Sequence, residues 1–352
     1  MEGKMKVMVM EDIGKVTIRK MDIPKPGPGQ VLVRIHQCNI CTTDWQTWKG
    51  LRKSMGRKFP WAPGHEMAGE IVELGEGVTN PALKIGTHVV FGGQGSRGCG
   101  ECHFCRSGHP DRCINKPKEV EFGGVSGSFG FSQYAAYESG RLYPVDSSIS
   151  YEEAGFVEPI STCIHGAKRI RIAPGDKVLV IGAGNLGLVN AQVAKVFGGD
   201  VIVSEISEER CRLAQSIGLK TVNPMKEDLN SAIKGFTKGI GVNVVILAVA
   251  NTTVNDQALK VLAPRGRILF FASGHPVPEL NVNANQIHYK EMELIGTYNS
   301  DPSDYQLAAE FLGSGVVKVG KIISQKIPMD DCQHAFELAS TPGTYRVSLT
   351  LD

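Results

Sequence analysis

The stretch that decides the fold reads Lys177-Val-Leu-Val-Ile181-Gly182-Ala-Gly184-Asn185-Leu186-Gly187. Its first five residues are mostly apolar and predict a buried strand, and a helix-length stretch at residues 188–197 follows the last glycine. In the G-x-G-x-x-G spacing, the first glycine permits a tight turn, the second lets a ligand approach the backbone, and the third lets the helix pack on the strand. The helix N-terminus then offers N–H groups to a pyrophosphate. The stretch therefore predicts a dinucleotide site at Gly182, Gly184, Asn185, Leu186 and Gly187.

Strands and helices alternate on both sides of this stretch. Further apolar strands at residues 201–203, 244–247 and 268–271 are separated by amphipathic, helix-length stretches. This alternation is typical of an α/β domain with a doubly wound parallel sheet, which we expect over residues 153–298. Residues 1–152 contain short β-rich runs joined by glycine- and proline-rich connections, and they predict an irregular β domain. We expect residues 299–352 to rejoin that first domain.

An acidic residue follows the second strand of the α/β domain. Glu205 lies about 20 residues beyond the glycine-rich turn, where a carboxylate accepts hydrogen bonds from the adenosine ribose hydroxyls. A carboxylate there repels a 2′-phosphate, so the sequence favours NAD over NADP. Two alternatives remain open: Glu205 could only cap the following helix, and Arg210 could neutralise the site for NADP.

Composition and charge exclude several classes of function. The chain of 352 residues is 42% hydrophobic and 21% charged, with a formal net charge of +2. This balance gives no reason to expect a nucleic-acid partner, and the length suggests two domains. Charged residues interrupt the first fifteen positions, so no secretory signal is apparent, and no apolar run reaches the roughly 20 residues that span a bilayer. These features favour a cytoplasmic protein that binds no membrane.

Four of the nine cysteines cluster at Cys99, Cys102, Cys105 and Cys113, in a glycine-rich segment. Four thiolates at this spacing can close a tetrahedral zinc site without a vacant position, and such a site is structural. An iron–sulfur cluster is the competing metal, because thiolates suit both. A nucleic-acid-binding zinc module is a third interpretation, which the acids Glu101 and Asp111 disfavour. We predict a structural zinc lobe at about residues 93–116.

Other residues with metal-binding side chains are scattered. Cys41 lies in Asn39-Ile-Cys41-Thr-Thr43-Asp44, His65 and Glu66 lie in Pro63-Gly-His65-Glu66, and Glu158 begins Glu158-Pro-Ile-Ser161. Each alone is unremarkable. Together with the four-cysteine segment and the glycine-rich turn, in this order, they resemble the zinc-containing medium-chain dehydrogenases over nearly the whole chain. The segment at Glu158, where classical alcohol dehydrogenases carry a cysteine, looks like the sorbitol, threonine and related polyol dehydrogenase branch.

This resemblance implies a Rossmann domain, a GroES-like catalytic domain and two zinc ions per chain. It implies a catalytic zinc held by Cys41 and His65, with Glu66 or Glu158 completing the protein ligands. Thr43 is similar in position to the family's proton-relay hydroxyl, and Asp44 to an acid that orients the zinc histidine; a turn threonine and a helix cap are the ordinary alternatives. The implied reaction is hydride transfer between NAD and a secondary alcohol, most simply a polyol or sugar alcohol. Relatives are commonly dimers or tetramers, so a homo-oligomer is expected.

The sequence also departs from the family's pattern near the expected substrate site. Thr42 and Thr43 replace the usual small residues after the cysteine, and Gly86-Thr-His-Val89 replaces a common Gly-Asp-Arg-Val. Trp45 and Trp48 could line the pocket or belong to the core. A further hypothesis is that a basic segment binds an anionic group on the substrate, such as a phosphate, through Arg52, Lys53, Arg57 and Lys58. Two functions remain as alternatives: a short-alcohol or threonine dehydrogenase, and a non-catalytic zinc-binding protein.

Overall fold

A computed structural model describes residues 2–52, 58–93, 98–115, 120–274 and 276–352. The chain forms two compact units. Unit 1 comprises Met1–Ser161, Ser300–Gly315 and Val319–Asp352, and unit 2 comprises Thr162–Asn299 and Val316–Lys318. Within the described ranges, no helix combines the length and the apolar character needed to cross a bilayer.

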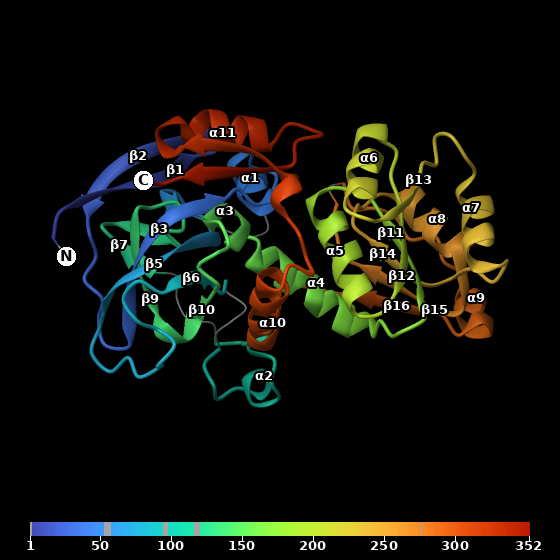
Figure 1. Ribbon diagram of the computed structural model, residues 1–352, viewed down its shortest axis with the longest axis horizontal. Helices are drawn as coiled ribbons and strands as arrows, with labels where there is room; N and C mark the ends of the chain where they lie inside the picture. Colours follow the sequence, from blue (N-terminus) through green and yellow to red (C-terminus); the bar gives the residue numbers. More distant parts are fainter. Residues whose placement is uncertain (1, 53–57, 94–97, 116–119, 275) are drawn as a thin grey trace. The chain divides into compact units, whose positions relative to one another are not determined.

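Unit 2 is built on a sheet of six described strands in the order β13-β12-β11-β14-β15-β16 (Figure 1). All neighbouring strands are parallel. The strands are β11 (Lys177–Ile181), β12 (Asp200–Ser204), β13 (Lys220–Val222), β14 (Val242–Leu247), β15 (Leu262–Phe270) and β16 (Glu293–Gly296). The helices are α4 (Val157–Ile170), which begins in unit 1, and α5 (Asn185–Val196), α6 (Glu208–Ser216), α7 (Leu229–Thr237), α8 (Thr252–Val261) and α9 (Ala284–Lys290).

This topology confirms the predicted doubly wound parallel sheet. Strands β11 and β14 are buried along nearly their whole length, as expected for strands covered by helices on both faces. Because β11 lies between β12 and β14, the strand order reverses at its carboxyl end. Ligands of open α/β sheets bind at such a reversal, outside the carboxyl ends of the strands.

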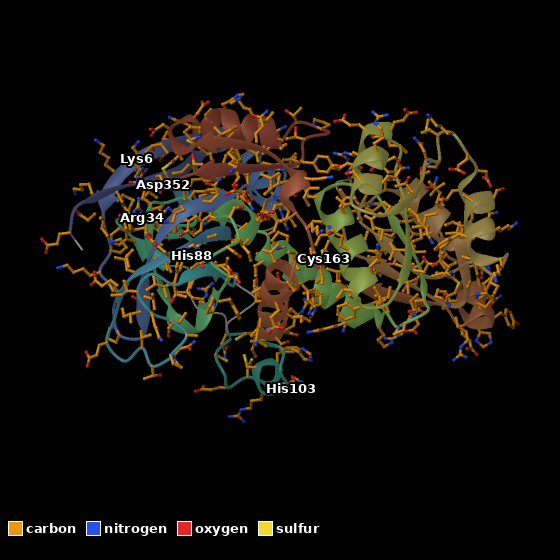
Figure 2. The ribbon with its side chains drawn as sticks, in the orientation of Figure 1. Lys6, Arg34, His88, His103, Cys163 and Asp352 are labelled. Atoms are coloured by element: carbon orange, nitrogen blue, oxygen red, sulfur yellow. The ribbon has the colours of Figure 1, made fainter. Side chains whose placement is uncertain are left out.

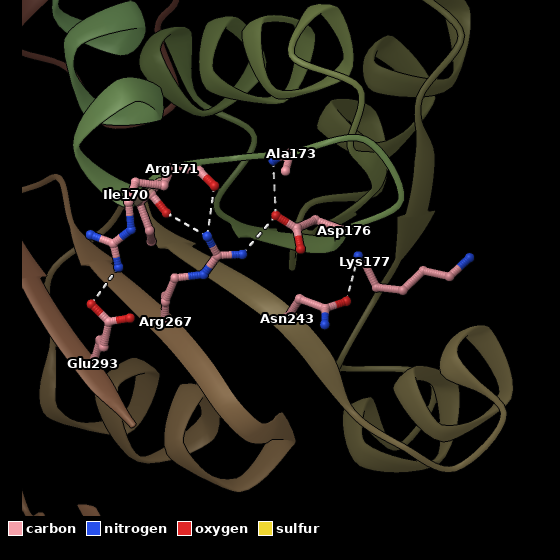
Figure 3. Close-up of polar contacts among 8 residues, drawn as sticks. All are labelled: Ile170, Arg171, Ala173, Asp176, Lys177, Asn243, Arg267 and Glu293. Carbon is pink, nitrogen blue, oxygen red and sulfur yellow. Dashed lines mark hydrogen bonds and ion pairs between the residues drawn. The ribbon is translucent and has the colours of Figure 1, made fainter. Parts of the chain in front are cut away.

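Arg267 of β15 stabilises the end of helix α4 (Figure 3). Its guanidinium donates to the carbonyl oxygens of Ile170 and Arg171, at 2.9 and 2.6 Å. It also donates to the carboxylate of Asp176 at 2.7 Å. The last carbonyls of a helix have no intrahelical partner and carry partial negative charge, so a cation placed there satisfies and stabilises them.

Unit 1 is mostly β-structure and contains two sheets in the described residues. One has the order β2-β1-β4-β8-β7, and the other has the order β10-β6-β5-β3-β18-β17, with β9 also paired to β3. The strands are β1 (Lys4–Asp12), β2 (Lys15–Asp22), β3 (Gln30–Asn39), β4 (Trp61–Ala62), β5 (Glu66–Leu74), β6 (His88–Phe91), β7 (Val120–Phe122), β8 (Val125–Gly127), β9 (Tyr134–Glu138), β10 (Leu142–Pro144), β17 (Ile323–Pro328) and β18 (Arg346–Thr350). The helices are α1 (Thr42–Trp48), α2 (His103–Arg106), α3 (Tyr151–Ala154), α10 (Pro302–Gly313) and α11 (Cys332–Ala339), with short 3₁₀ turns at Pro110–Arg112, Ser139–Arg141, Gly320–Ile322 and Met329–Asp331.

The C-terminal strand completes the second sheet of unit 1. Strand β18 pairs antiparallel with β3, so that Ser348 lies opposite Asn39. The last residue, Asp352, places a carboxylate oxygen 2.8 Å from Nδ1 of His36. The same oxygen lies 3.4 Å from Nη2 of Arg34, and Figure 2 labels Asp352 and Arg34. These contacts place the last residues of the chain beside the strand that leads to Cys41.

The structure shows that one of the two tryptophans, Trp48, belongs to the hydrophobic core of unit 1. Trp48 is buried and packs against Phe336 of α11, with 6.0 Å between the ring centroids. Trp48 therefore belongs to the core. Trp45 is only partly buried, and the Lys49 ammonium lies 5.7 Å from the centre of its ring.

Candidate functional site

The glycine-rich turn between β11 and α5 lies at the carboxyl end of the central strand. Gly182 has a φ of +103°, which side-chain-bearing residues rarely adopt. A Cβ at Gly187 would lie 1.9 Å from the carbonyl oxygen of Gly182, so a glycine there is required by the close packing of helix on strand. A Cβ at Gly184 would meet no described protein atom closer than Nη1 of Arg210, at 4.0 Å. Internal packing therefore does not require a glycine at this position, and the space beside Gly184 is open.

Glu205 follows β12 and is held against this turn. Its two carboxylate oxygens accept hydrogen bonds from the backbone N–H groups of Ala183, at 2.7 Å, and Ser207, at 2.9 Å. The N-cap of α6 is Ser207, whose hydroxyl accepts the N–H of Arg210. Ser207 therefore caps α6. Glu205 instead holds the glycine-rich turn, at the expected cofactor site, through its hydrogen bond with Ala183. Asn185 and Leu186 form the first turn of α5, beside it.

The four clustered cysteines converge on one point in unit 1. All four sulfur atoms lie within 4.8 Å of one another, and Cys102 Sγ is 3.5 Å from Cys105 Sγ and 3.9 Å from Cys113 Sγ. Four thiolates around a single zinc, with Zn–S bonds of about 2.3 Å, lie about 3.8 Å apart. A cluster of several iron atoms holds its thiolates farther apart. The spacing therefore fits one tetrahedral ion better than an iron–sulfur cluster.

Backbone groups prepare the cysteine lobe for a cation. The N–H of Cys102 donates to Cys99 Sγ, and the N–H of Cys99 donates to Cys113 Sγ, both at 3.3 Å. Backbone hydrogen bonds, first from Cys105 and then from Ile114, lower the pKa of the Cys102 thiol to about 6. Because several thiolates at this distance repel one another, a cation bound here would supply the compensating charge.

A second group of metal-binding side chains forms where β3, α1 and β5 meet. The ligand atoms of Cys41, His65 and Glu66 lie within 4.8 Å of one another. Cys41 is the N-cap of α1, and Glu66 is the first residue of β5, opposite Asn39 of β3. The pairing of β3 with β5 therefore brings the two sequence motifs together.

Asp44 organises this group from within α1. It is 1% exposed, one carboxylate oxygen accepts the N–H of Cys41 at 3.0 Å, and the other lies 3.6 Å from Nδ1 of His65. A carboxylate beside one ring nitrogen leaves the other nitrogen of the imidazole for a ligand role. Thr43 lies in the first turn of α1 and is partly exposed; its carbonyl accepts a hydrogen bond from Thr47.

Glu66 has a partner that the sequence did not indicate. Arg346 of β18 places Nη2 3.0 Å from Oε1 of Glu66, and both residues are at most 3% exposed. Arg346 also donates to the carbonyl oxygen of Ile40 at 2.9 Å. Neither carboxylate oxygen of Glu66 makes a hydrogen bond of good geometry with a described residue. This buried carboxylate thus retains the capacity to bind a cation.

The charges around this group oppose one another. Burial acts to raise the pKa of Cys41, but the charges of His65 and Arg346 shift it downward overall. Burial also acts to lower the pKa of His65, but the charges of Asp44 and Cys41 raise it well above its usual value. Burial raises the pKa of Glu66 well above its usual value, against the effect of Arg346. A thiol, an imidazole and a carboxylate are all ordinary zinc ligands, and a zinc ion bound here would take the place of the protons that the raised pKa values of His65 and Glu66 favour.

Glu158 stands beside the group but outside it. The ligand atoms that lie within mutual reach here are those of Cys41, His65 and Glu66, and among the described residues Glu158 belongs to no such group. Burial raises the pKa of Glu158 to about 7; the charge of His65 opposes this shift, and that of Glu66 adds to it. The residue keeps part of its surface exposed. Its carboxylate is therefore close enough to influence the group electrostatically without sharing its centre.

The remaining sequence-based sites have mixed outcomes. His88, in the segment that departs from the family's pattern, places Nε2 2.9 Å from the hydroxyl of Tyr151. Of the basic segment proposed to bind an anion, Lys53 and Arg57 lie outside the described residues, while Arg52 is partly exposed and Lys58 exposed. The anion-binding hypothesis therefore stays a prediction.

Comparison with known proteins assigns the family. Residues 27–147 match the model of the alcohol dehydrogenase GroES-like domain, and residues 186–314 match that of the zinc-binding dehydrogenases. The L-threonine 3-dehydrogenase of Pyrococcus horikoshii is 32% identical over 345 residues, which cover 94% of each chain. The chain belongs to the zinc-containing medium-chain alcohol dehydrogenase family. The predicted resemblance is thus confirmed.

Other similar members of this medium-chain dehydrogenase family act on different alcohols. The L-galactonate-5-dehydrogenase of Escherichia coli K12 is 28% identical, covering 95% of this chain and 94% of its own length. The sorbitol dehydrogenase of Halalkalibacterium halodurans is 27% identical over 98% of both chains. Among solved structures, a zinc-binding dehydrogenase from Sinorhizobium meliloti 1021 bound to NADP is 25% identical, with a TM-score of 0.87 and 99% coverage of both chains. The chain is therefore an oxidoreductase of the zinc alcohol dehydrogenase family.

Proposed function

We propose that this dehydrogenase transfers hydride between NAD and a secondary alcohol of a polyol or sugar-derived substrate, giving the ketone. The observation that carries the proposal is the Cys41, His65 and Glu66 group, with Glu158 beside it in place of a second cysteine ligand. The similarity to sorbitol and L-galactonate dehydrogenases supports a polyhydroxylated substrate. The similarity to threonine dehydrogenases supports a second candidate, an amino-acid alcohol.

In this proposal, Cys41, His65 and Glu66 hold the catalytic zinc, and Cys99, Cys102, Cys105 and Cys113 hold a structural zinc. The catalytic zinc supplies Lewis acidity that lowers the pKa of the substrate hydroxyl. Asp44 fixes the orientation of His65 and the turn at Cys41. Arg346 balances the charge of Glu66, and the Thr43 hydroxyl provides the first step of a proton route to solvent.

A substrate panel tests this function. Purified enzyme is assayed by NADH absorbance with polyols, sugar acids, sugar phosphates, short secondary alcohols and threonine, each with NAD and NADP. We expect the highest kcat/KM with a polyol or sugar acid. A higher value with threonine would replace the first candidate with the second, and no turnover with any compound would favour a non-catalytic zinc protein. Gel filtration of the same sample tests the expected dimer or tetramer.

The role of Glu158 can be tested by removing the charge of its carboxylate. We expect Glu158→Gln to lower kcat at least tenfold, about 1.4 kcal/mol of barrier, because it removes a charge beside the catalytic group while keeping size and polarity. Metal analysis of Glu158→Gln should find that the four-cysteine lobe still contains its zinc. Glu153→Gln makes the same chemical change on α3 and should leave kcat unchanged. Wild-type turnover and full zinc occupancy in Glu158→Gln would reduce Glu158 to a packing residue and weaken the assignment to the polyol branch.

The carboxylate of Glu205 should determine which nicotinamide cofactor the enzyme prefers. A buried carboxylate beside the glycine-rich turn should exclude a 2′-phosphate, so the enzyme should prefer NAD. Glu205→Ser should lower the ratio of kcat/KM for NAD to that for NADP about tenfold, or about 1.4 kcal/mol.

A matched variant separates charge from the shape of the turn. Because Glu205 also accepts the N–H of Ala183, its loss could loosen the turn and weaken both cofactors equally. Glu205→Gln keeps an acceptor and removes only the charge, and Glu209→Gln repeats that change in the first turn of α6. We expect only the change at Glu205 to alter the ratio. If the wild type already favours NADP, the ribose assignment is wrong and Arg210 becomes the residue to test.

A further inference from the structure

Strands β5, β3 and β18 carry a row of polar side chains on the face of their sheet that lies away from the hydrophobic core of unit 1. Asn39 of β3 lies opposite Glu66 of β5 and opposite Ser348 of β18. Residues directly opposite on antiparallel strands share one face of the sheet, with Cβ atoms about 4.5–5.5 Å apart. The neighbouring pair, Cys38 and Leu349, belongs to the hydrophobic core on the other face. Glu66, Asn39 and Ser348 therefore form one continuous row.

Arg346 adds a positive charge to the same face. It lies two residues before Ser348 on β18, so its side chain leaves the sheet on the same side. Its guanidinium joins the strands, with Nη1 2.9 Å from the carbonyl oxygen of Ile40 and Nη2 3.0 Å from Oε1 of Glu66. The side chains of Arg346, Glu66, Asn39 and Ser348 are at most 3% exposed. This face is thus polar and almost closed to solvent.

Helix α3 and the glycine after it cover the row. Nδ2 of Asn39 donates to the carbonyl oxygen of Glu152 at 3.1 Å. A Cβ on Gly155 would lie 2.7 Å from that nitrogen and 2.7 Å from the carbonyl oxygen of Glu66. The amide of Asn39 is therefore held between the sheet and Gly155, and the bond made by Nδ2 also fixes the position of Oδ1.

Each side chain of the row has a buried polar atom without a hydrogen-bond partner among the described residues. These atoms are Oδ1 of Asn39, Oγ of Ser348, Nε of Arg346 and both carboxylate oxygens of Glu66. Native proteins leave few buried donors and acceptors without a partner, because each is costly. A metal ion at Glu66 would use one of its oxygens and would leave the atoms of Asn39, Ser348 and Arg346 unexplained. These atoms therefore point to a second ligand.

The chemistry of the four groups identifies this ligand as water. Oδ1 of Asn39 and the Glu66 carboxylate accept hydrogen bonds, Nε of Arg346 donates, and the Ser348 hydroxyl can do both. Water has two protons and two lone pairs, so one molecule can donate to both acceptors and accept from both donors. A metal cation cannot accept from Arg346, and Glu66 repels a small anion. Buried water molecules typically bind about three polar groups that are otherwise unsatisfied.

We propose that an ordered water molecule is a fixed component of this face, bound by Asn39, Ser348 and Arg346 and donating a hydrogen bond to the carboxylate of Glu66. The site goes beyond the proposed function, because it requires neither zinc nor substrate. Its effect on the metal group does rest on that function. Hydrogen bonds to a ligating carboxylate support metal binding, and such contacts are worth about 10–100-fold in affinity or activity.

A crystal structure of the full-length, zinc-loaded enzyme tests the water site directly. We expect an ordered water within hydrogen-bond distance of Oδ1 of Asn39 and of the Glu66 carboxylate. Ser348→Val replaces the hydroxyl with methyl groups and should displace this water. Thr350→Val makes a similar change two residues along β18, at a hydroxyl that donates to the carbonyl oxygen of Ile327, and should retain it. A wild-type map that shows other buried waters but none here would overturn the proposal.

Thermal unfolding gives a second readout that depends on neither a crystal nor turnover. Ser348→Ala adds no bulk, so overpacking cannot contribute to its effect. If the water is bound, the variant removes one of its partners, and we expect a lower melting temperature than for the wild type. If the face is dry, the variant removes only an unsatisfied hydroxyl, and an unchanged or higher melting temperature would overturn the proposal.

Zinc retention separates the water site from its effect on the metal group. We expect Ser348→Val to lose the catalytic zinc to a chelator about tenfold faster than the wild type, with the four-cysteine lobe unaffected. Thr350→Val should lose it at the wild-type rate. If the wild-type crystal contains the water and Ser348→Val still retains zinc like the wild type, the water site stands and its role in metal binding is wrong. If no zinc binds at Cys41 and His65 in the wild type, the proposed function fails, and the crystal and the melting temperature still decide the water site.

Discussion

Cys41→Ser is expected to give a folded protein whose turnover has fallen by more than about 100-fold. Loss of a residue that only supports a metal ligand lowers activity or metal affinity by about 10–100-fold, and loss of a ligand itself should cost more. The serine hydroxyl does not replace a thiolate as a zinc ligand at neutral pH. The fold should persist, because Cys41 caps a helix of only seven residues whose other contacts remain. Circular dichroism, thermal unfolding and metal analysis measure these outcomes, and about one zinc per chain should be retained.

Cys38 provides the matched control for this variant. It is fully buried in β3, three residues before Cys41, and lies outside the group of metal-binding side chains in the described residues. Cys38→Ala should retain both zinc ions and most of the activity. An active Cys41→Ser enzyme with two zinc ions per chain would remove Cys41 from the proposed site. Equal losses in both cysteine variants would point to packing instead of metal binding.

Cys102→Ser is expected to damage the fold itself. A closed thiolate site links metal binding to folding, and structural zinc sites in small peptides contribute apparent free energies of about 10–16 kcal/mol at neutral pH. The short helix α2 and the turns around it bury little apolar surface, so the lobe depends on its sulfur atoms. A Cβ at Gly98 would lie 2.2 Å from Cys105 Sγ, which shows how tightly the backbone wraps this point.

The measurements are the melting temperature, limited proteolysis of the lobe and zinc content. We expect a lower melting temperature and cleavage within residues 98–115, and removal of the lobe zinc from the wild type by a chelator should have the same result. Cys211→Ser, in α6 and outside the metal-binding groups of the described residues, is the control. Unchanged melting with a full zinc complement in Cys102→Ser would falsify the assignment of Cys102 to a structural site.

Much of the fold and of the candidate site could be predicted because its signals are local. The glycine spacing at residues 182–187 predicts a turn between strand and helix, and the structure explains Gly182 by its positive φ and Gly187 by close packing. The four cysteines lie close together in sequence, so their convergence in space needs only a compact loop. Short-range patterns of this kind survive in almost any tertiary context.

Tertiary structure alone decided which distant groups meet. Glu66 and Glu158 are both carboxylates near family motifs, and the sequence could not tell which one joins Cys41 and His65; pairing of β3 with β5 brings Glu66 into that group. Arg346 reaches Glu66 because β18 adds to the same sheet beside β3. Tyr305 meets Gly93 only because α10 returns to unit 1.

The physical reason is that these partners are selected by sheet register and packing, which depend on contacts between residues far apart in the chain. No short-range sequence pattern predicts which residue a buried arginine or tyrosine will contact. Burial requires only that some partner satisfy its polar atoms. The sequence by itself determined the family, the doubly wound sheet and the candidate metal-binding residues. The tertiary structure decided that Arg346 faces Glu66, that Glu205 holds the glycine-rich turn, and that the Tyr305 hydroxyl binds the backbone of Gly93.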